Sequence, residues 1–586
     1  MLDHAAYTEA ARRNYYQQDP AFASLMRQTL SPDWHTWAAD RLEAVGGVAA
    51  TRWADLAVVA NEAPPRLRTH DRWGDRIDRV EVHPAYEQLA KEAYEAGVVW
   101  PRFNPVLDGE QAPWSVVFAL GYLMAQAEQG FFCPVCLTAG TAWLLERFGD
   151  DHLKTEYLSR VASPDYDTLY EGAMFLTERT GGSDVGAATT EARHENGQWT
   201  LWGDKWFASN GGRARALLVL ARPDGAPAGP RGLGLFRVPR ARPDGSPNAI
   251  RLHRLKDKLG TRSMPSTELS FEGALAYPVG DVAKGFSHMA EMLNLSRLYN
   301  AVASVANMRR MINEALAFAG ARVAFGSRVE DYPMVRAQLI ERTVEQEADL
   351  RLVFEAIRLL DQVESGDHAP RDPLLTRVLT PMIKYHTARE AVDTASWAAE
   401  AFGGVGYIEE WPTPRFLRDA QVLPIWEGTT NILVLDVLRS FAKEGTGPAL
   451  LAELGARLEP AVSPAIAPWR EAVAREVADW GHHLQALSAL DQAGQTVHAK
   501  AWCDRAVRLY QAVLLLEEAE RGLQAGDGRG VLVAGAFMRR HLSPRTWRDT
   551  IAGTGVEAYG AIVRHAPVTP DAAVAMVRDA MAALPR

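Results

Sequence analysis

The spacing of hydrophobic positions changes twice along this chain. From residue 2 to about residue 170, apolar residues recur every three or four positions in stretches such as YEQLAKEAYEAG and GYLMAQAEQG, which is typical of amphipathic helices. The segment NEAPPRLRTHDRWGD interrupts this pattern, because its Pro, Gly and Asn residues favour a loop. Residues 1–170 are therefore predicted to form an N-terminal helical domain with an irregular extension.

A different pattern follows, in which short apolar runs are separated by Gly, Pro, Asn and Asp. The runs are AMFLTE, GQWTLWGDKWFASN, ALLVLARP, LGLFRVPR and STELSFEG. In the second run, Trp199 and Leu201 would share one face of a strand and Thr200 and Trp202 the other. A small antiparallel β domain is predicted over residues 171–282.

Helical spacing returns in the last part of the chain. Apolar residues such as Met289 and Met292 recur at helical intervals, and longer amphipathic stretches begin at MVRAQLIERTVEQ and LLTRVLTPMIKYH. Short connections between long helices favour an antiparallel bundle, which we place at residues 283–443. After the linker EGTGPA, residues 444–586 are predicted to form an additional C-terminal helical domain.

The order helices, strands, helices predicts an α+β fold that is mainly α, with a central β domain. It lacks the alternation of strands and helices that builds a parallel sheet, and no GxGxxG sequence follows a predicted strand. A Rossmann domain is therefore not expected, and a dinucleotide would have to be held by another arrangement.

Composition restricts the class of protein. The chain has 586 residues, of which 47% are apolar and 23% charged, the balance of an ordinary globular protein with several domains. A formal net charge of −10 argues against general attraction to nucleic acid or anionic lipid, because those partners repel a net acid. We expect a cytoplasmic protein that binds no membrane, since neither a leader peptide nor a run of roughly 20 apolar residues is found.

Three cysteines in so long a chain cannot form a disulfide framework, which agrees with a reducing compartment. Cys133 and Cys136 form a CPVC sequence, which by itself could be a redox pair or half of a zinc site. A structural zinc site needs four ligands, yet the only other cysteine is Cys503 and no HExxH sequence occurs. We therefore interpret Cys133 and Cys136 as buried thiols and expect no metal.

Five segments stand out for their chemistry. In MFLTERTGGSDVG, an apolar strand enters a Gly-rich turn with hydroxyls at Thr177 and Ser183, and the backbone amides of such a turn can point at one anion. A purely structural turn is the common explanation for such a segment when it occurs alone. The other segments are DKWFASNGG at 204–212, DKLGTRSMPSTEL at 257–269, AFGGVGYIEEWPTPRFLRDA at 401–420 and PIWEGTTNIL at 424–433.

In this order, the segments resemble the motifs of the acyl-CoA dehydrogenase family over roughly residues 80–440. The strings WEG, TNI and RLKDKLG and the long helical tail are most similar to the AidB branch, known as alkylation-response proteins. The resemblance implies a helical domain, a small antiparallel β domain, a four-helix bundle and an extra C-terminal helical domain. It also implies FAD, an acyl-CoA substrate, an electron-transfer flavoprotein as electron acceptor, and a homotetramer or dimer of dimers whose neighbouring subunits share FAD.

The resemblance also assigns contacts with the cofactor. The TERTGGSD match places Leu176, Thr177 and Ser183 at the flavin, and the WFASNGG match places Phe207 and Ser209 against the isoalloxazine ring, with Ser209 near N5. ARVAFG resembles the bundle motif that reaches the FAD of a neighbouring subunit. The same comparison assigns the remaining contacts to Arg322 at the pyrophosphate, Phe325 on the adenine side, and Gly403, Gly404, Thr429 and Asn431.

Glu427 stands where most of the family has its catalytic base. Desaturation requires removal of the α-proton of the thioester while a hydride leaves the β-carbon for flavin N5. A carboxylate beside an apolar, closed pocket can do this, because desolvation favours its protonated form. The backbone N–H of Glu427 would stabilise the developing enolate oxygen.

Two alternatives bear on this assignment. Glu427 could instead cap a helix that begins at Thr429 or Asn431, and the two roles are compatible. Some members of the family place the base on the first bundle helix, but Ser296 occupies that position here and a serine cannot serve. The resemblance therefore favours Glu427 as the base.

The resemblance assigns four residues to the substrate. Ser183 would lie near the thioester, and Arg297, in the window LNLSRLYN, is similar to a substrate-side arginine. Asn294 stands where relatives often carry an Asp that binds the adenine end of CoA. Arg439, in LDVLRS, matches a second substrate-side arginine.

Two functions fit these observations. One is an FAD-dependent acyl-CoA dehydrogenase; the other is an AidB-like FAD-bearing DNA-binding protein that protects DNA and has weak or vestigial dehydrogenase activity. Residues 451–586 hold 15 Lys and Arg against 15 Asp and Glu, so this tail has no net charge. Its one candidate patch for DNA phosphates is MRRHLSPRTWRD, with Arg539, Arg540, Arg545 and Arg548. Salt-dependent affinity for duplex DNA would support the second function.

Overall fold

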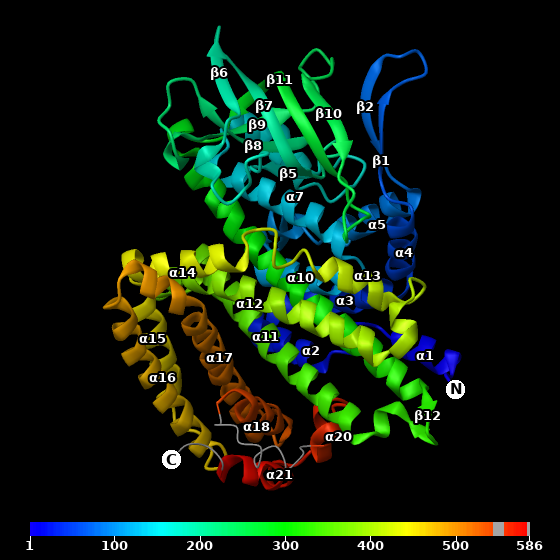
Figure 1. The fold of residues 1–586 in the computed structure, drawn as a ribbon, viewed down its shortest axis with the longest axis vertical. Helices are drawn as coiled ribbons and strands as arrows, with labels where there is room; N and C mark the ends of the chain where they lie inside the picture. The colour runs from blue at the N-terminus through cyan, green and yellow to red at the C-terminus, as the bar shows by residue number, and fades with distance from the viewer. Residues whose placement is uncertain (543–555, 583–586) are drawn as a thin grey trace. The chain divides into compact units, whose positions relative to one another are not determined.

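The computed structural model describes residues 1–542 and 556–582, and helices make up most of it (Figure 1). The predicted fold class is confirmed, because helices precede and follow a set of strands in the middle of the sequence. None of the described helices has both the length and the apolar character needed to cross a membrane.

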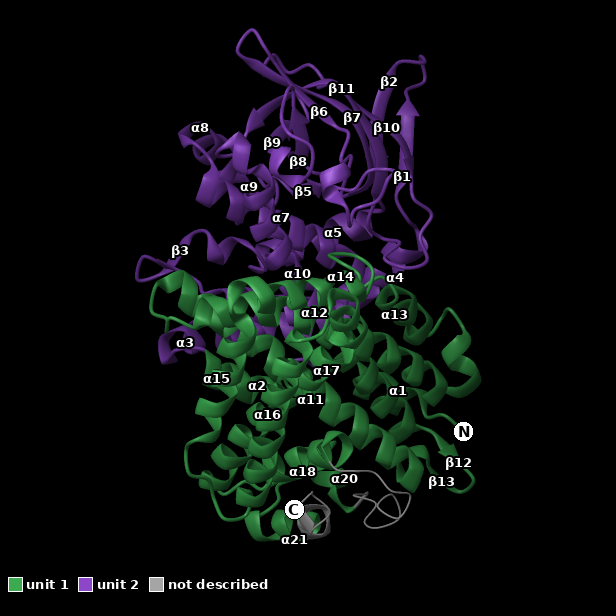
Figure 2. Ribbon diagram, turned by 60° about the vertical axis from the view of Figure 1, so that its left-hand side comes forward, with its two compact units in different colours: residues 1–13, 17–29, 304–586 green, residues 14–16, 30–303 purple. Residues whose placement is uncertain are grey.

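Contacts within the chain define two compact units (Figure 2). Unit 1 comprises residues 1–13, 17–29 and 304–586, and unit 2 comprises residues 14–16 and 30–303. The long helix α10 (Gly285–Ala321) contributes to both units. The finer division at residues 170, 282 and 443 stays a prediction.

Several helices of unit 2 begin where the local sequence supplies a cap. Ser31 accepts a hydrogen bond from Trp34 N at 3.4 Å, and Pro32 takes the first helical position, where its missing N–H has no helical partner to lose. Glu128 caps α7 by accepting from Phe131 N at 2.5 Å. The main helices are α3 (Pro32–Val48), α4 (Ala54–Glu62), α5 (Pro84–Glu95), α6 (Trp114–Ala125) and α7 (Gln129–Phe148).

The sheet of unit 2 has seven strands in the order β10-β11-β7-β6-β8-β5, and β9 pairs with both β11 and β8. Most pairings of this sheet are antiparallel, as predicted, but β8 pairs in parallel with β5 and β6. The first six residues of β8 are buried, and a fully covered strand gives a continuous apolar run such as ALLVL instead of an alternation. The strands are β5 (Gly172–Phe175), β6 (Glu191–Glu195), β7 (Gln198–Ser209), β8 (Ala216–Pro223), β9 (Gly234–Pro239), β10 (Ile250–Leu255) and β11 (Ser266–Pro278).

The predicted alternation along β7 is confirmed. Leu201 is buried in the core of the sheet and Trp199 packs against that core, whereas Trp202 is 38% exposed. Helix α7 lies directly against β5, because a Cβ on Gly172 would stand only 2.4 Å from Thr141 Oγ1. This close approach fixes the strand that leads into the TERTGGSD turn.

The segment predicted as a loop within the first 170 residues contains β1 (Arg66–His70), which forms a hairpin with β2 (Arg76–Glu81) directly after that segment. Arg and His fill most positions of β1, so the apolar alternation that marks a strand is missing there. The carboxylate of Asp71 forms the turn by accepting two backbone N–H groups, at 2.8 and 3.0 Å. Asp78 accepts from Leu252 N at 3.0 Å, which ties the hairpin to the edge strand β10.

Unit 1 is built from long helices. Helix α12 contacts α11 and α14, and α17 of the C-terminal part of the chain contacts all three of them. The helices are α1 (His4–Ala11), α2 (Pro20–Thr29), α11 (Pro333–Ser365), α12 (Asp372–Ala401), α13 (Pro412–Ala420), α14 (Thr430–Glu444), α15 (Thr446–Leu458), α16 (Ala467–Ser488), α17 (Gln492–Gln524), α18 (Arg529–His541), α20 (Tyr559–Ile562) and α21 (Pro570–Ala582).

The contact between α11 and the C-terminal helices includes several buried charged side chains. Five charged residues of α11 are buried, and we call them the charged seam: Glu345, Glu347, Asp349, Arg351 and Glu355. Each has a partner in the C-terminal helices. The pairs are Glu345 with Arg508 and His541, Glu347 with Arg529, Asp349 with Gln511, Arg351 with Glu518, and Glu355 with Arg457.

Glu347 shows how much such a pair matters. Burial by itself would raise the pKa of Glu347, but Arg529 donates two hydrogen bonds, at 2.5 and 3.0 Å, and lowers that pKa from 4.5 to about 2. The carboxylate is thus charged in the folded chain at every pH above about 2. The stability that the pair contributes is present above pH 4.5 and is lost as the pH falls toward 2.

Replacing Arg529 with Met should lower the free energy of unfolding by about 3–5 kcal/mol at pH 7, because it leaves a buried carboxylate without its cation. Below pH 4.5 the difference from wild type should shrink as Glu347 becomes protonated. Urea unfolding at a series of pH values measures both effects. The matched control is Arg521→Met, whose guanidinium is 46% exposed and pairs with Glu518, and which should cost less than about 1 kcal/mol. Equal losses in the two variants would contradict a stabilising role for the seam.

Candidate functional site

Glu427 lies between α13 and α14 of unit 1 in an uncommon backbone conformation. Its φ is 56° and that of Gly428 is 103°. A left-handed non-Gly residue costs of order 1–3 kcal/mol and persists only where the surrounding structure holds it. A Cβ on Gly428 would stand 2.9 Å from Leu433 Cδ2, so both the φ and the space require glycine here. The Oε2 atom of Glu427 is shielded from solvent.

Helix capping does not account for Glu427. Helix α14 begins at Thr430 and its N-cap residue is Thr429, with no acidic residue in the first turn. Glu427 therefore precedes the cap by two positions. Ser296, the position of the alternative base, lies on α10 with an exposed fraction of 1%.

The flavin residues predicted in unit 2 lie at the ends of β5 and β7. Trp206 N donates to Thr177 O at 3.0 Å, which places the residues after β5 beside the end of β7. There Phe207 is 55% exposed although it is a large aromatic residue, and Ser209 is half-buried. Ser183 lies exposed in the Gly-rich turn.

This arrangement fits a flavin. An exposed aromatic ring flanked by hydroxyls offers one flat apolar surface and several hydrogen bonds to a polar planar ring. A Cβ on Gly182 would lie 2.5 Å from Thr177 Oγ1, so glycine at that position leaves space around the hydroxyl. The residues present therefore suit the cofactor that the motifs predict.

A buried ion pair that the motifs did not reveal supports these strands. Lys205 Nζ donates to Glu178 Oε1 at 2.8 Å and to Leu176 O at 3.3 Å, and Glu178 also accepts hydrogen bonds from the backbone and hydroxyls of Thr189 and Thr190. Burial acts to raise the pKa of Glu178, but Lys205 and these donors outweigh it and lower that pKa to about 2. The pair joins residues 27 positions apart, a spacing that carries no sequence signal.

The cofactor residues predicted in the bundle meet in unit 1. Arg322 Nη1 donates to Phe402 O at 3.4 Å, and a Cβ on Gly403 would stand 3.7 Å from the same nitrogen. Gly404 faces open space, and Phe325 is 99% exposed with a left-handed φ of 53°. Thr429 and Asn431 are exposed at the start of α14, where helix N–H groups have no helical partner.

An aromatic cluster brings Arg322 and Gly403 together. The rings of Phe318 and Phe402 stack with centroids 4.3 Å apart, and Tyr7 and Trp411 pack edge-on or tilted against them. These residues come from four separate segments, so their association depends on the fold.

Three of the four predicted substrate residues lie on two helices, and the fourth, Ser183, is in the Gly-rich turn. Arg297 donates to Asn294 Oδ1 at 3.0 Å within α10. Arg439 lies on α14, where it is 56% exposed and donates to Asp436 at 2.9 Å. Of the two neighbouring cysteines on α7, Cys136 is buried and Cys133 half-buried. Among the described residues, no group of three or more His, Cys, Asp and Glu is placed to hold a metal ion.

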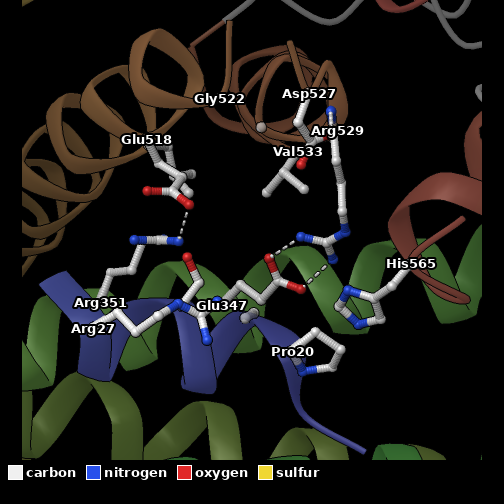
Figure 3. Close-up of a pocket in the computed structure, with 14 residues that line it drawn as sticks. Pro20, Arg27, Glu347, Arg351, Glu518, Gly522, Asp527, Arg529, Val533 and His565 are labelled. Atoms are coloured by element: carbon white, nitrogen blue, oxygen red, sulfur yellow. Dashed lines mark hydrogen bonds and ion pairs between the residues drawn. The ribbon is translucent and has the colours of Figure 1, made fainter. Parts of the chain in front are cut away.

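A cavity of about 240 Å³ lies in unit 1, and it is lined by residues of α2, α11, α17 and α18 and by His565 (Figure 3). Arg351 and Arg529 point into it but already have Glu518 and Glu347 as partners. Burial and the nearby charge of Arg529 lower the pKa of His565 to about 3, so its ring is neutral at pH 7. None of the residues described as lining this cavity is a predicted site residue, and its paired charges belong to the charged seam.

Three family models match the chain in sequence order. The AidB N-terminal domain of the adaptive response protein matches residues 7–168, the acyl-CoA dehydrogenase middle domain matches residues 173–274, and the acyl-CoA dehydrogenase C-terminal domain matches residues 283–442. The matched ranges include every predicted site residue.

Known proteins show the same likeness. The chain is 36% identical to acyl-CoA dehydrogenase family member 11 of Caenorhabditis elegans, over 76% of this chain and 73% of that protein. It is 34% identical to acyl-CoA dehydrogenase AidB of Escherichia coli, over 75% and 80%. The crystal structure of C. elegans ACDH-11 in complex with C11-CoA matches with a TM-score of 0.84 at 31% identity, covering 94% of this chain and 95% of that one. The apo-form of Bd2924 matches with a TM-score of 0.79 at 34% identity, over 86% and 97%.

Replacing Lys205 with Met should weaken FAD retention, because Glu178 then loses its cation and no longer holds the strand ends in place. We expect the dissociation constant for FAD to rise about 10-fold, which corresponds to about 1.4 kcal/mol. Fluorescence titration of the flavin-free protein measures it. Arg193→Met is the matched control, since its 41% exposed side chain pairs with Glu191 on the same sheet and should leave FAD affinity unchanged. Equal affinity in wild type and Lys205→Met would reject a supporting role for the pair.

Proposed function

The chain belongs to the acyl-CoA dehydrogenase family, and we propose that it desaturates an acyl-CoA thioester with Glu427 as the base that removes the α-proton. The observation that supports this most is the conformation of the loop that carries Glu427. A glutamate held in left-handed backbone, with one carboxylate oxygen shielded from water, marks a position where geometry takes precedence over local stability.

The residues of this chain suit the proton transfer. Burial penalises the charged form of a carboxylate, so a shielded Glu427 gains from taking up the α-proton. Its own backbone N–H can donate to the enolate oxygen as negative charge develops there. Ser296 offers no competing base.

FAD is the cofactor of this family, and when bound it supplies the acceptor for the hydride that leaves the β-carbon. In unit 2, Thr177 and Ser209 would donate hydrogen bonds to it, and Phe207 would cover its ring. The other proposed contacts in this unit are with Leu176 and Ser183.

The unit 1 set is proposed to serve the FAD of a neighbouring subunit in a homotetramer or dimer of dimers. Arg322 would hold the pyrophosphate, for which a guanidinium is well shaped, and Gly403 and Gly404 let the backbone approach closely. Phe325 supports this proposal, since a large aromatic side chain that is 99% exposed in one chain is suited to being covered in an assembly. Thr429 and Asn431 would add contacts from the start of α14.

The substrate is proposed to be held by Ser183, Asn294, Arg297 and Arg439, and its electrons to pass to an electron-transfer flavoprotein. The solved relative in complex with C11-CoA supports an acyl-CoA of comparable length as one candidate. The AidB-like DNA-protective function has less support. Arg540 pairs with Glu341 and Glu345 and is not available to phosphate, while Arg545 and Arg548 lie outside the described residues.

Replacing Glu427 with Gln should slow reduction of the flavin by an acyl-CoA about 10²- to 10⁴-fold, because the amide cannot take up the α-proton. The measurement is anaerobic mixing with straight, branched and aromatic acyl-CoAs, including a C11 thioester, while flavin absorbance is followed. Glu476→Gln is the control in the same unit: this residue pairs with Arg505 in the C-terminal helices, and its loss should leave the rate unchanged. If no thioester bleaches the flavin absorbance of the wild-type protein with a full complement of FAD, the dehydrogenase proposal fails. Affinity for duplex DNA then becomes the next measurement.

Arg439→Ala should weaken binding before it affects chemistry. We expect the dissociation constant for acyl-CoA to rise about 3- to 10-fold, with the reduction rate at saturating substrate nearly unchanged. Titration of the flavin spectrum and stopped-flow reduction separate the two quantities. Unchanged affinity would remove Arg439 from the substrate site.

A further inference from the structure

A buried ammonium group on α12 contacts the loop that carries Glu427. Lys384 has an exposed fraction of 0%, and its Nζ donates to Gly428 O at 2.7 Å. Lysine is almost never fully buried unless its charge is paired or hydrogen-bonded, because the ammonium is strongly hydrated in water. Burying Lys384 in the interior of unit 1 therefore costs free energy, and its hydrogen bond to Gly428 O offsets part of that cost.

The loop needs an external support. Gly428 must be glycine, because its φ is 103° and a Cβ would meet Leu433, yet glycine by itself leaves the backbone free to adopt many conformations. On either side the chain is fixed by its own turns, since Trp426 N donates to Val422 O and Leu433 N donates to Thr429 O. Between these two turns, Lys384 holds the carbonyl of the residue that follows Glu427.

We propose that Lys384 is a positioning residue for the base. By holding Gly428 O from a neighbouring helix, it keeps Glu427 in the left-handed conformation and so fixes where the carboxylate lies. The inference rests on the proposed function, because it assigns to Lys384 the placement of the same base. Lys384 and Gly428 are 44 residues apart in the sequence, and the packing of α12 against α14 brings them into contact.

The test compares Lys384→Met with Tyr385→Phe in the full-length protein loaded with FAD. Met keeps the aliphatic length of Lys384 but removes the donor. Tyr385 is the neighbouring residue on α12, it is also buried, and its hydroxyl donates to Asp504 at 3.0 Å in the C-terminal helices. Tyr385→Phe therefore removes a buried hydrogen bond of the same helix without touching the Glu427 loop.

The first readout is hydrogen–deuterium exchange of peptides that span residues 422–433, which needs no substrate. Lys384→Met should exchange there about 10-fold faster than wild type, whereas Tyr385→Phe should match wild type in this segment. If the Met variant does not fold, Lys384→Gln, which shortens the donor, is compared in its place. Wild-type exchange in a folded Lys384 variant would overturn the inference.

The second readout is flavin reduction by the acyl-CoA that wild type uses. Lys384→Met should lower the rate constant about 10²-fold, as a displacement of about 1 Å can, while acyl-CoA affinity changes less than about 3-fold. The kinetic isotope effect with α-deuterated substrate should rise, because proton removal becomes slower relative to other steps. Lys384→Arg, which keeps a cationic donor, should recover most of the rate.

The two readouts separate the possible failures. If no thioester reduces the flavin of the wild-type protein, the proposed function fails. Hydrogen–deuterium exchange by itself still decides whether Lys384 holds the loop. If wild type is active and Lys384→Met loosens the loop but keeps the wild-type rate and isotope effect, the contact is a structural anchor and the positioning role is rejected.

Discussion

A charged side chain that leaves water must find a partner, and this constraint shapes both units of the protein. In unit 2, Lys205 and Glu178 pair beneath the strand ends that carry the flavin residues. In unit 1, the charged seam of α11 meets its counter-charges on the C-terminal helices. Lys384 follows the same rule with a backbone carbonyl as its partner. In each case a partner that is distant in the sequence helps to fix the position of an element.

Backbone strain is concentrated where function is proposed. Asn and Asp account for four of the eight described non-Gly residues with positive φ, and these side chains tolerate that region readily. The other four are Thr261, Phe325, Glu427 and His565, and two of them are the proposed base and a proposed cofactor contact. A left-handed Glu427 is explained more readily by a need for geometry than by local propensity, because glutamate, unlike Gly, Asn and Asp, seldom adopts this conformation.

Membership of the acyl-CoA dehydrogenase family leaves open how this chain uses the fold. The C-terminal helices bury charged groups of α11, and among the arginines of the candidate DNA patch Arg540 pairs with Glu345. The same helices contact α11, and α11 packs against α12, the helix that carries Lys384. Their observed contacts are thus with the protein itself, and this favours support of the enzyme over a separate binding function.

Apolar pattern and motif order were enough to predict most elements and the candidate site residues. The spacing of apolar residues identified the long helices and β7, and short apolar runs between turn residues identified β5, β8, β9 and β11. These patterns did not identify the hairpin of β1 and β2, whose strands are rich in Arg, or the parallel pairing of β8, because such pairing depends on which strands meet. The motifs and their order predicted Glu427 and the flavin residues. Tertiary structure alone decided that Arg322 lies beside Gly403, that Lys205 holds Glu178 and that Lys384 holds Gly428, because hydrogen bonds between distant segments leave no periodic trace in a single sequence.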